Sequence, residues 1–87
     1  MAEWRWEYDP TADHVIGGLD DLAFIARVEE TADELVRAAA AQFLDGSLYR
    51  GTSPKVSEEV IPGGMFLHQV IPRHQCVYIL QVTLAPH

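Results

Sequence analysis

Residues 20–44 read DDLAFIARVEETADELVRAAAAQFL, and this stretch decides the fold. Its apolar residues recur at alternating steps of three and four, which places them on one side of a helix: Ile25, Val28, Ala32, Leu35 and Ala39, widened by Phe24, Val36, Ala40 and Phe43. Asp20 and Asp21 suit the helix start and Gly46 suits its C-cap. We therefore predict an amphipathic helix of about 37 Å, whose stripe needs an apolar partner surface.

The last third of the chain supplies that surface as strands. Residues 55–61, 65–71 and 76–84 are rich in β-branched and apolar residues, and short turns at 62–64 and 72–75 separate them. Two short turns predict an antiparallel meander. In the third strand, alternation predicts one shared face for five residues: Cys76, Tyr78, Leu80, Val82 and Leu84.

The first residues predict another strand and a short helix. Trp4, Trp6 and Tyr8 alternate with charged residues, which is typical of a half-buried strand. Asp9 suits an N-cap and Pro10 a first helical position, so we predict a helix over 10–16 that ends at Gly17-Gly18. Because its connection to the long helix is short, the two helices are predicted to form an antiparallel hairpin.

These elements predict an α+β fold of order β-α-α-β-β-β in one domain, residues 1–87. The helical hairpin should pack on one face of a small antiparallel sheet and leave the other face open. The alanine run at 38–41 keeps the long helix slim. It predicts either close packing in the core or a seam between two copies in a homodimer.

Charge and composition narrow the function classes. The net charge is −7, with eleven acidic and three basic residues in 1–46 but two acidic and three basic residues in 47–87. An acidic chain is a poor general binder of polyanions, so only the C-terminal half should face a phosphate. The chain has no apolar run of about 20 residues, which argues against a membrane span. Its start, MAEWRWEYDP, is not typical of a signal peptide, and its single cysteine rules out an internal disulfide, so a cytoplasmic location is expected.

The pattern of the whole chain resembles a known family. WRWEYDPTA, a helical hairpin, and then YRGTSPKVSEEV, PGG, MFLHQVIP and CVYILQVTLAPH together resemble the RelE/ParE toxin superfamily of bacterial toxin–antitoxin systems. The resemblance implies a RelE-like fold and a protein antitoxin as partner, with no cofactor. It also implies one of two activities, which are cleavage of messenger RNA on the ribosome without a metal and inhibition of DNA gyrase.

Metal-free RNA cleavage needs a base, an acid and a cation near the phosphate. The candidate catalytic residues are Lys55, His68 and His87, and the candidate phosphate- or RNA-binding residues are Arg50, Arg73 and His74. By its place just before the first meander strand, Lys55 resembles a catalytic lysine of the family. His68 shares its strand face with Phe66 and Val70, so a buried core position is the alternative. The structural alternative for Lys55 is an ordinary strand-edge lysine. For Arg73 and His74 it is a solvated turn, and for His87 it is a frayed terminus.

Other chemistries have weaker support. The spacing of His68, His74 and Cys76 matches no zinc motif, so no metal site is predicted, and Cys76 alternates with apolar residues as a core residue would. The strand MFLHQVIP also lacks the arginine that RelE-like toxins carry there. Three hypotheses therefore remain open: an endoribonuclease toxin, a catalytically inactive protein-binding module on the same fold, and a self-associating structural protein.

Overall fold

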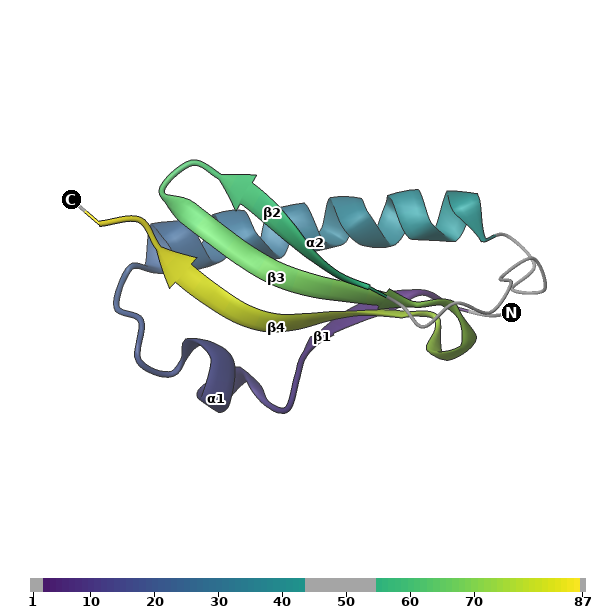
Figure 1. The fold of residues 1–87 in the computed structure, drawn as a ribbon, viewed down its shortest axis with the longest axis horizontal. Helices are drawn as coiled ribbons and strands as arrows, with labels where there is room; N and C mark the ends of the chain where they lie inside the picture. Colours follow the sequence, from purple (N-terminus) through teal and green to yellow (C-terminus); the bar gives the residue numbers. More distant parts are fainter. Residues whose placement is uncertain (1–2, 44–54, 87) are drawn as a thin grey trace.

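The computed structural model describes residues 3–43 and 55–86. Its elements follow the predicted order, with a short 3-10 helix added between the last two strands. They are β1 (Arg5–Tyr8), α1 (Ala12–Ile16), α2 (Leu22–Gln42), β2 (Val56–Ile61), β3 (Gly64–Ile71), η1 (Pro72–His74) and β4 (Cys76–Leu84). The α+β class is therefore confirmed, with one long helix packed on a sheet (Figure 1).

The sheet is mixed, where the sequence predicted an antiparallel one. Its order is β1-β4-β3-β2; β2, β3 and β4 run antiparallel as expected, but β1 lies parallel to β4. A short turn forces antiparallel pairing, and such turns join β2 to β3 and β3 to β4. No short turn constrains β1, because both helices and two strands separate it from β4 in the chain.

Helix α2 covers one face of the sheet and buries the predicted stripe. The buried apolar residues form a single cluster, which is Phe24, Val28, Ala32, Ala39, Phe66, Val77, Ile79 and Val82. Phe24 is fully buried in this cluster, whereas Ile25 is half-buried. Each large apolar side chain removed from water contributes about 1.5–3 kcal/mol. The contact between the helix and the sheet is therefore the main source of stability.

The long helix begins as predicted. Asp21 is its N-cap, and the Asp21 Oδ1 atom accepts a hydrogen bond of 3.0 Å from the backbone N–H of Phe24. The helix ends at Gln42 with Phe43 as C-cap, and the predicted C-cap Gly46 lies outside the described residues.

The short helix α1 differs from the prediction in its cap and its packing. Thr11, not Asp9, is the N-cap, and its side chain accepts a hydrogen bond from the backbone N–H of His14. The contacts of α1 are mainly with β4 and β1, so it does not form a helical hairpin with α2 (Figure 1). The apolar residues Val15 and Ile16 pack against the edge of the core, which explains why α1 lies beside the sheet.

The faces of β4 do not alternate along its whole length. Leu67 pairs with Gln81 but His68 pairs with Ile79, so Leu80 is an extra residue in a β-bulge. The bulge reverses the faces, so that Ile79 and Val82 are both buried. The prediction of one shared face from Cys76 to Leu84 is therefore wrong.

Strand β1 is held to α2 by its aromatic side chains. The Trp6 indole N–H donates a hydrogen bond of 2.9 Å to Asp33, and the Tyr8 hydroxyl donates one of 2.9 Å to Glu29. Burial and this hydrogen bond raise the pKa of Tyr8 well above its ordinary value. These bonds confirm a half-buried aromatic strand, and they explain how β1 keeps its place beside β4.

Candidate functional site

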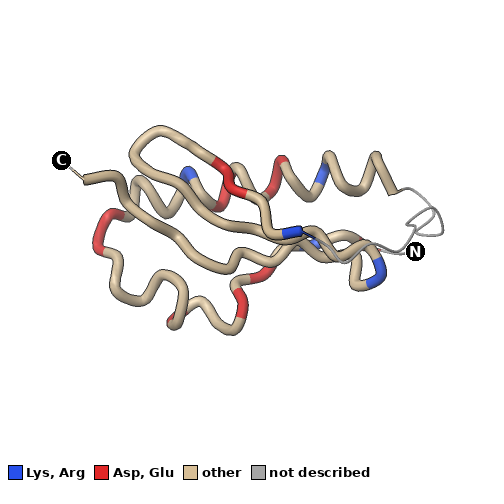
Figure 2. Tube along the Cα trace, in the orientation of Figure 1, with Lys and Arg blue, Asp and Glu red and all other residues tan. Residues whose placement is uncertain are grey.

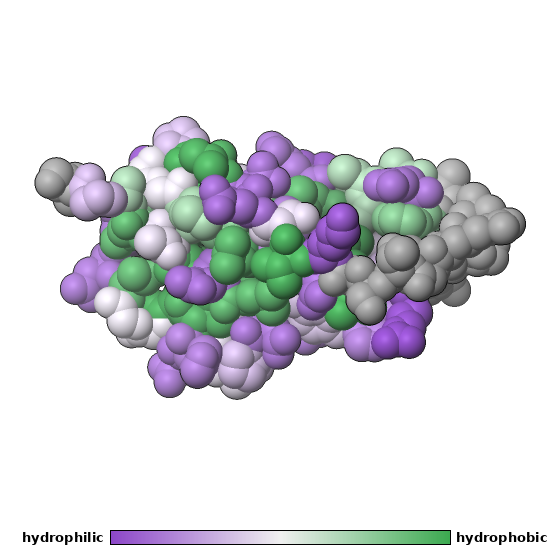
Figure 3. Space-filling model, in the orientation of Figure 1, coloured by the Kyte–Doolittle hydropathy of each residue, from purple (hydrophilic) through white to green (hydrophobic). Residues whose placement is uncertain are grey.

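The open face of the sheet, opposite α2, is the candidate functional site. The strand register places alternate side chains on it, and its central members are Val56, Glu58 and Val60 from β2, Met65, Leu67 and Gln69 from β3, and Tyr78 from β4. Apolar residues gather on this face over the strands (Figure 3). Its two ends differ in chemistry, because one is an apolar groove and the other carries basic and hydroxyl side chains.

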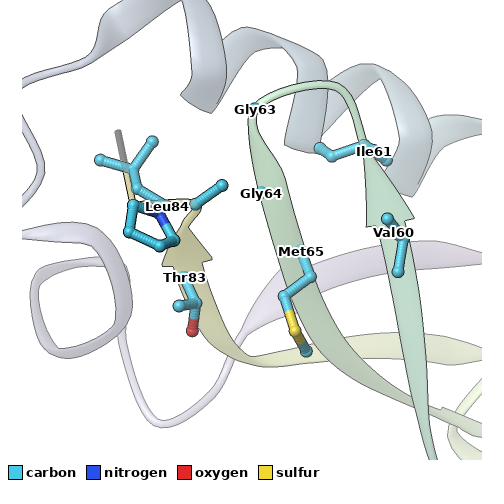
Figure 4. A pocket seen from close by; sticks show the side chains of 9 residues that line it. Val60, Ile61, Gly63, Gly64, Met65, Thr83 and Leu84 are labelled. Carbon is cyan, nitrogen blue, oxygen red and sulfur yellow. The ribbon is translucent and has the colours of Figure 1, made fainter.

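The apolar groove lies at the turn between β2 and β3. It has a volume of about 410 Å³, and its lining includes Val60, Ile61, Met65, Leu84, Ala85 and Pro86 (Figure 4). Gly64 belongs to the groove lining, and a Cβ atom there would lie 2.2 Å from the Thr83 carbonyl oxygen. Only glycine therefore lets β3 and β4 approach so closely at this end.

Strand β2 leaves two valines in contact with water. Val56 is 52% exposed and Val60 is 72% exposed, although both are β-branched residues in a strand. Scattered exposed apolar residues are ordinary, but Val60 also lines the groove and pairs across the strands with Met65, whereas Val56 lies at the other end of β2. An exposed apolar residue at the mouth of an apolar groove, as Val60 is, favours a site that another molecule covers.

The opposite end of the sheet gathers basic residues from three elements. Lys55 precedes β2, Arg5 begins β1, and Arg73 belongs to η1, and the register places all three at the same end (Figure 2). The structure therefore places two of the predicted site residues, Lys55 and Arg73, at the same end of the sheet although they are 18 positions apart in the chain. It adds Arg5, which the sequence analysis did not single out.

A histidine and a tyrosine meet at this basic end. The His74 Nδ1 atom lies 3.0 Å from the Tyr78 hydroxyl oxygen, and the two rings are arranged edge to face. Arg5 donates hydrogen bonds to the His74 carbonyl oxygen at 3.2 Å and to Glu7 at 2.6 Å. The sequence predicted His74 as a phosphate ligand but missed Tyr78. His74 ends η1 and Tyr78 lies in β4, so the two residues share no single helix or strand whose periodicity would predict their contact.

His68 lies on the other side of the sheet, in the core. It is 6% exposed, faces α2 together with Phe66, and its Nδ1 atom has no hydrogen-bond partner among the described residues. Burial lowers the pKa of His68, and the nearby Glu59 carboxylate opposes that effect in part. The structure therefore places His68 in the buried position that the sequence left as its alternative, where no substrate on the open face can reach it.

Two of the predicted site residues have no described position, and Cys76 belongs to the core. Arg50 and His87 lie outside the described residues. Cys76 is fully buried, and burial raises the pKa of its thiol, which keeps it in the protonated, unreactive form. In the described ranges 3–43 and 55–86, no three His, Cys, Asp or Glu residues gather as metal ligands, and no helix is long and apolar enough to cross a membrane.

Comparison of the chain with protein-family models, curated proteins and solved structures found no match. No family is therefore assigned, and the function is argued from the site alone.

Proposed function

We propose that this chain is a protein-binding module of the toxin–antitoxin type, whose open sheet face holds an antitoxin-like partner protein. The observation that carries the proposal is the apolar surface of exposed Val60 and half-buried Met65, continuous with the groove beside Leu84, with exposed Val56 further along the same face of β2. A surface of this kind gains about 25 cal/mol for each Å² of apolar area that a partner covers. The resemblance of the sequence pattern to the RelE/ParE toxin superfamily suggests the kind of partner.

Binding is favoured over catalysis by the placement of the candidate residues. His68 is in the core, whereas Lys55 is exposed just before β2, so these two candidate catalytic residues do not share a site. A net charge of −7 also opposes a long RNA backbone, because RNA affinity depends on basic residues. The apolar face carries no such penalty toward a protein.

The proposal is tested by co-expression with the product of the adjacent reading frame. We expect the two proteins to co-purify as one complex of defined stoichiometry on size-exclusion chromatography with light scattering. Val60→Asp should weaken the complex by at least about tenfold, because a charge would be buried at the interface. Ala26→Asp, on the exposed side of α2, is the matched control and should leave affinity unchanged.

Two outcomes would overturn this function. One is the absence of any complex with the neighbouring product. The other is a complex that Ala26→Asp weakens as much as Val60→Asp does. DNA gyrase is the other protein partner that the resemblance implies, so inhibition of supercoiling by the purified chain is assayed in parallel.

A second candidate function is cleavage of ribosome-bound messenger RNA at the basic end of the sheet. The observation in its favour is the 3.0 Å contact of His74 with Tyr78, close to Arg5 and at the same end as Lys55 and Arg73. There His74 or Tyr78 would move the proton and a basic side chain would hold the phosphate charge.

Mapping of transcript ends after induction tests the second candidate. New ends should appear with the wild-type chain and disappear with His74→Ala. His14→Ala is the matched control, because His14 is an exposed histidine on α1 away from this end. Unchanged transcript ends with a wild-type chain that still arrests growth would reject cleavage and leave the binding function standing.

A further inference from the structure

Strand β2 lies at the edge of the sheet. The strand order ends with β2, so one side of it pairs with β3 and the other side pairs with no strand among the described residues. An edge strand presents a row of free N–H and C=O groups that can accept another strand. Its side chains are open as well, since Val56, Glu58 and Val60 are all exposed.

We propose that an extended, basic segment of the partner adds to the sheet along β2. This inference rests on the proposed function and specifies how the partner binds and what its sequence contains. Main-chain hydrogen bonds supply affinity in such strand addition, and alternate side chains supply specificity. The following features of β2 select the partner chemistry.

The first feature is the side-chain pattern on the open face. Val56, Glu58 and Val60 occupy alternate positions there, so the edge presents an apolar, an acidic and an apolar residue in turn. A strand laid beside β2 would place its own alternate side chains next to these three. The complementary segment therefore carries an apolar, a basic and an apolar residue at every second position.

The second feature is the groove at the end of the same strand. Val60 and Ile61 belong both to β2 and to the groove lining, so the edge and the groove form one continuous surface. Figure 4 shows Val60 and Met65 beside each other at this end of the sheet. The apolar residue of the added segment that lies next to Val60 would cover the mouth of the groove. This continuity favours one segment that occupies both.

The third feature disfavours a second copy of the chain as the occupant. Two β2 strands can pair antiparallel through a two-fold axis, with their open faces on the same side of the sheet. In that arrangement one residue lies opposite its own copy. The central registers place Glu58 opposite Glu58 or Glu59 opposite Glu59. Like charges directly opposite each other are destabilising, and each copy already carries a net charge of −7. The two glutamates thus oppose self-pairing and attract a basic strand.

The test uses the full chain and two synthetic peptides that differ at one position. Both have the pattern Thr-Val-Thr-Xaa-Thr-Val-Thr, so that valine, Xaa and valine occupy every second position. Xaa is lysine in one peptide and glutamate in the other. Binding is followed through the backbone amide shifts of the chain by NMR titration. We expect the lysine peptide to shift amides along β2, and the glutamate peptide to bind about fivefold more weakly or worse.

A charge reversal makes the test specific. Glu58→Lys should invert the preference, so that the glutamate peptide binds more tightly than the lysine peptide. Glu30→Lys, on the exposed side of α2, changes the net charge equally and should leave the preference as in the wild type. If Glu58→Lys lowers the melting temperature markedly, Glu58→Gln replaces it and should abolish the preference.

Several outcomes would overturn strand addition. Three concern the peptides: neither binds, both bind with equal affinity, or Glu30→Lys inverts the peptide preference as Glu58→Lys does. A fourth is that the amide shifts centre on α2 or η1. The fifth is that β2 amides shift with protein concentration when no peptide is present, which would identify a second copy as the occupant. None of them bears on whether the neighbouring product forms a complex that depends on Val60. The failure of this inference is therefore distinguishable from failure of the proposed function.

Discussion

At the residue scale, His68 shows how burial changes the chemistry of a side chain. Its Nδ1 atom is buried without a hydrogen-bond partner among the described residues, next to the ring of Phe66. A buried polar group without a partner costs free energy, of the order of 1–3 kcal/mol. The imidazole is tolerated because it stays neutral, and this makes the stability of the fold depend on pH.

Acidic pH should destabilise the protein through His68. Its folded-state pKa is lowered by burial, so between that pKa and the unfolded value of about 6.5 the unfolded state binds more protons. The stability that depends on neutral His68 is therefore fully present above pH 6.5. It is lost as the pH falls, by up to about 1.4 kcal/mol of unfolding free energy per pH unit. Urea unfolding at a series of pH values measures it.

His68→Leu is the comparison variant for this titration. It removes the titrating group and the unpartnered nitrogen, so the free energy of unfolding at pH 7 should rise by about 1 kcal/mol. Its stability should also fall less steeply than that of the wild type between pH 6.5 and 5. Equal slopes in the two proteins would show that other groups carry the pH dependence.

At the scale of the elements, the start of α2 depends on one carboxylate. Asp21 Oδ1 caps the backbone N–H of Phe24, whose side chain is fully buried in the core. Asp21→Ala should lower the free energy of unfolding by about 1 kcal/mol, because the capping bond is lost. Asp20→Ala is the control, since Asp20 is exposed and precedes the cap, and thermal unfolding followed by circular dichroism compares the two.

The turn between β2 and β3 requires glycine at position 64. A Cβ there would lie 2.2 Å from the Thr83 carbonyl oxygen and 2.8 Å from the Phe24 ring. Gly64→Ala should therefore separate β3 from β4 and lower the unfolding free energy by at least about 2 kcal/mol. At Gly18 a Cβ would meet nothing within 4 Å, so Gly18→Ala is the control and should be close to neutral. Denaturant unfolding of both variants measures the difference.

At the scale of the whole molecule, stability should decrease from the centre of the sheet to its outer edge. β3 and β4 are paired on both sides and carry the buried residues Phe66, Val77 and Ile79, whereas β2 is an edge strand with exposed valines. Amide hydrogen exchange should be slowest in β4, β3 and the middle of α2, and faster in β2. Binding of the partner along β2 should slow exchange there specifically, which hydrogen-exchange mass spectrometry can measure.

Local patterns in the sequence predicted every helix and strand except the short η1, although they placed the start of α1 two residues early. The three-and-four spacing predicts α2, and the aromatic alternation of Trp4, Trp6 and Tyr8 predicts β1. The turn residues of the last third predict the β2-β3-β4 meander, and Asp21 predicts the cap. These features depend on interactions between residues a few positions apart, so they are visible in any short window of the chain.

Tertiary structure alone decided how these elements meet. The parallel pairing of β1 with β4, the bulge at Leu80 and the location of α1 beside the sheet depend on contacts between distant segments. The same contacts decide that His68 faces the core and that Lys55, Arg73 and Arg5 share one end. A residue's neighbours in sequence do not determine its neighbours across a sheet. Burial of the α2 stripe decides which face of the sheet each side chain joins, because the side that covers the helix must exclude water.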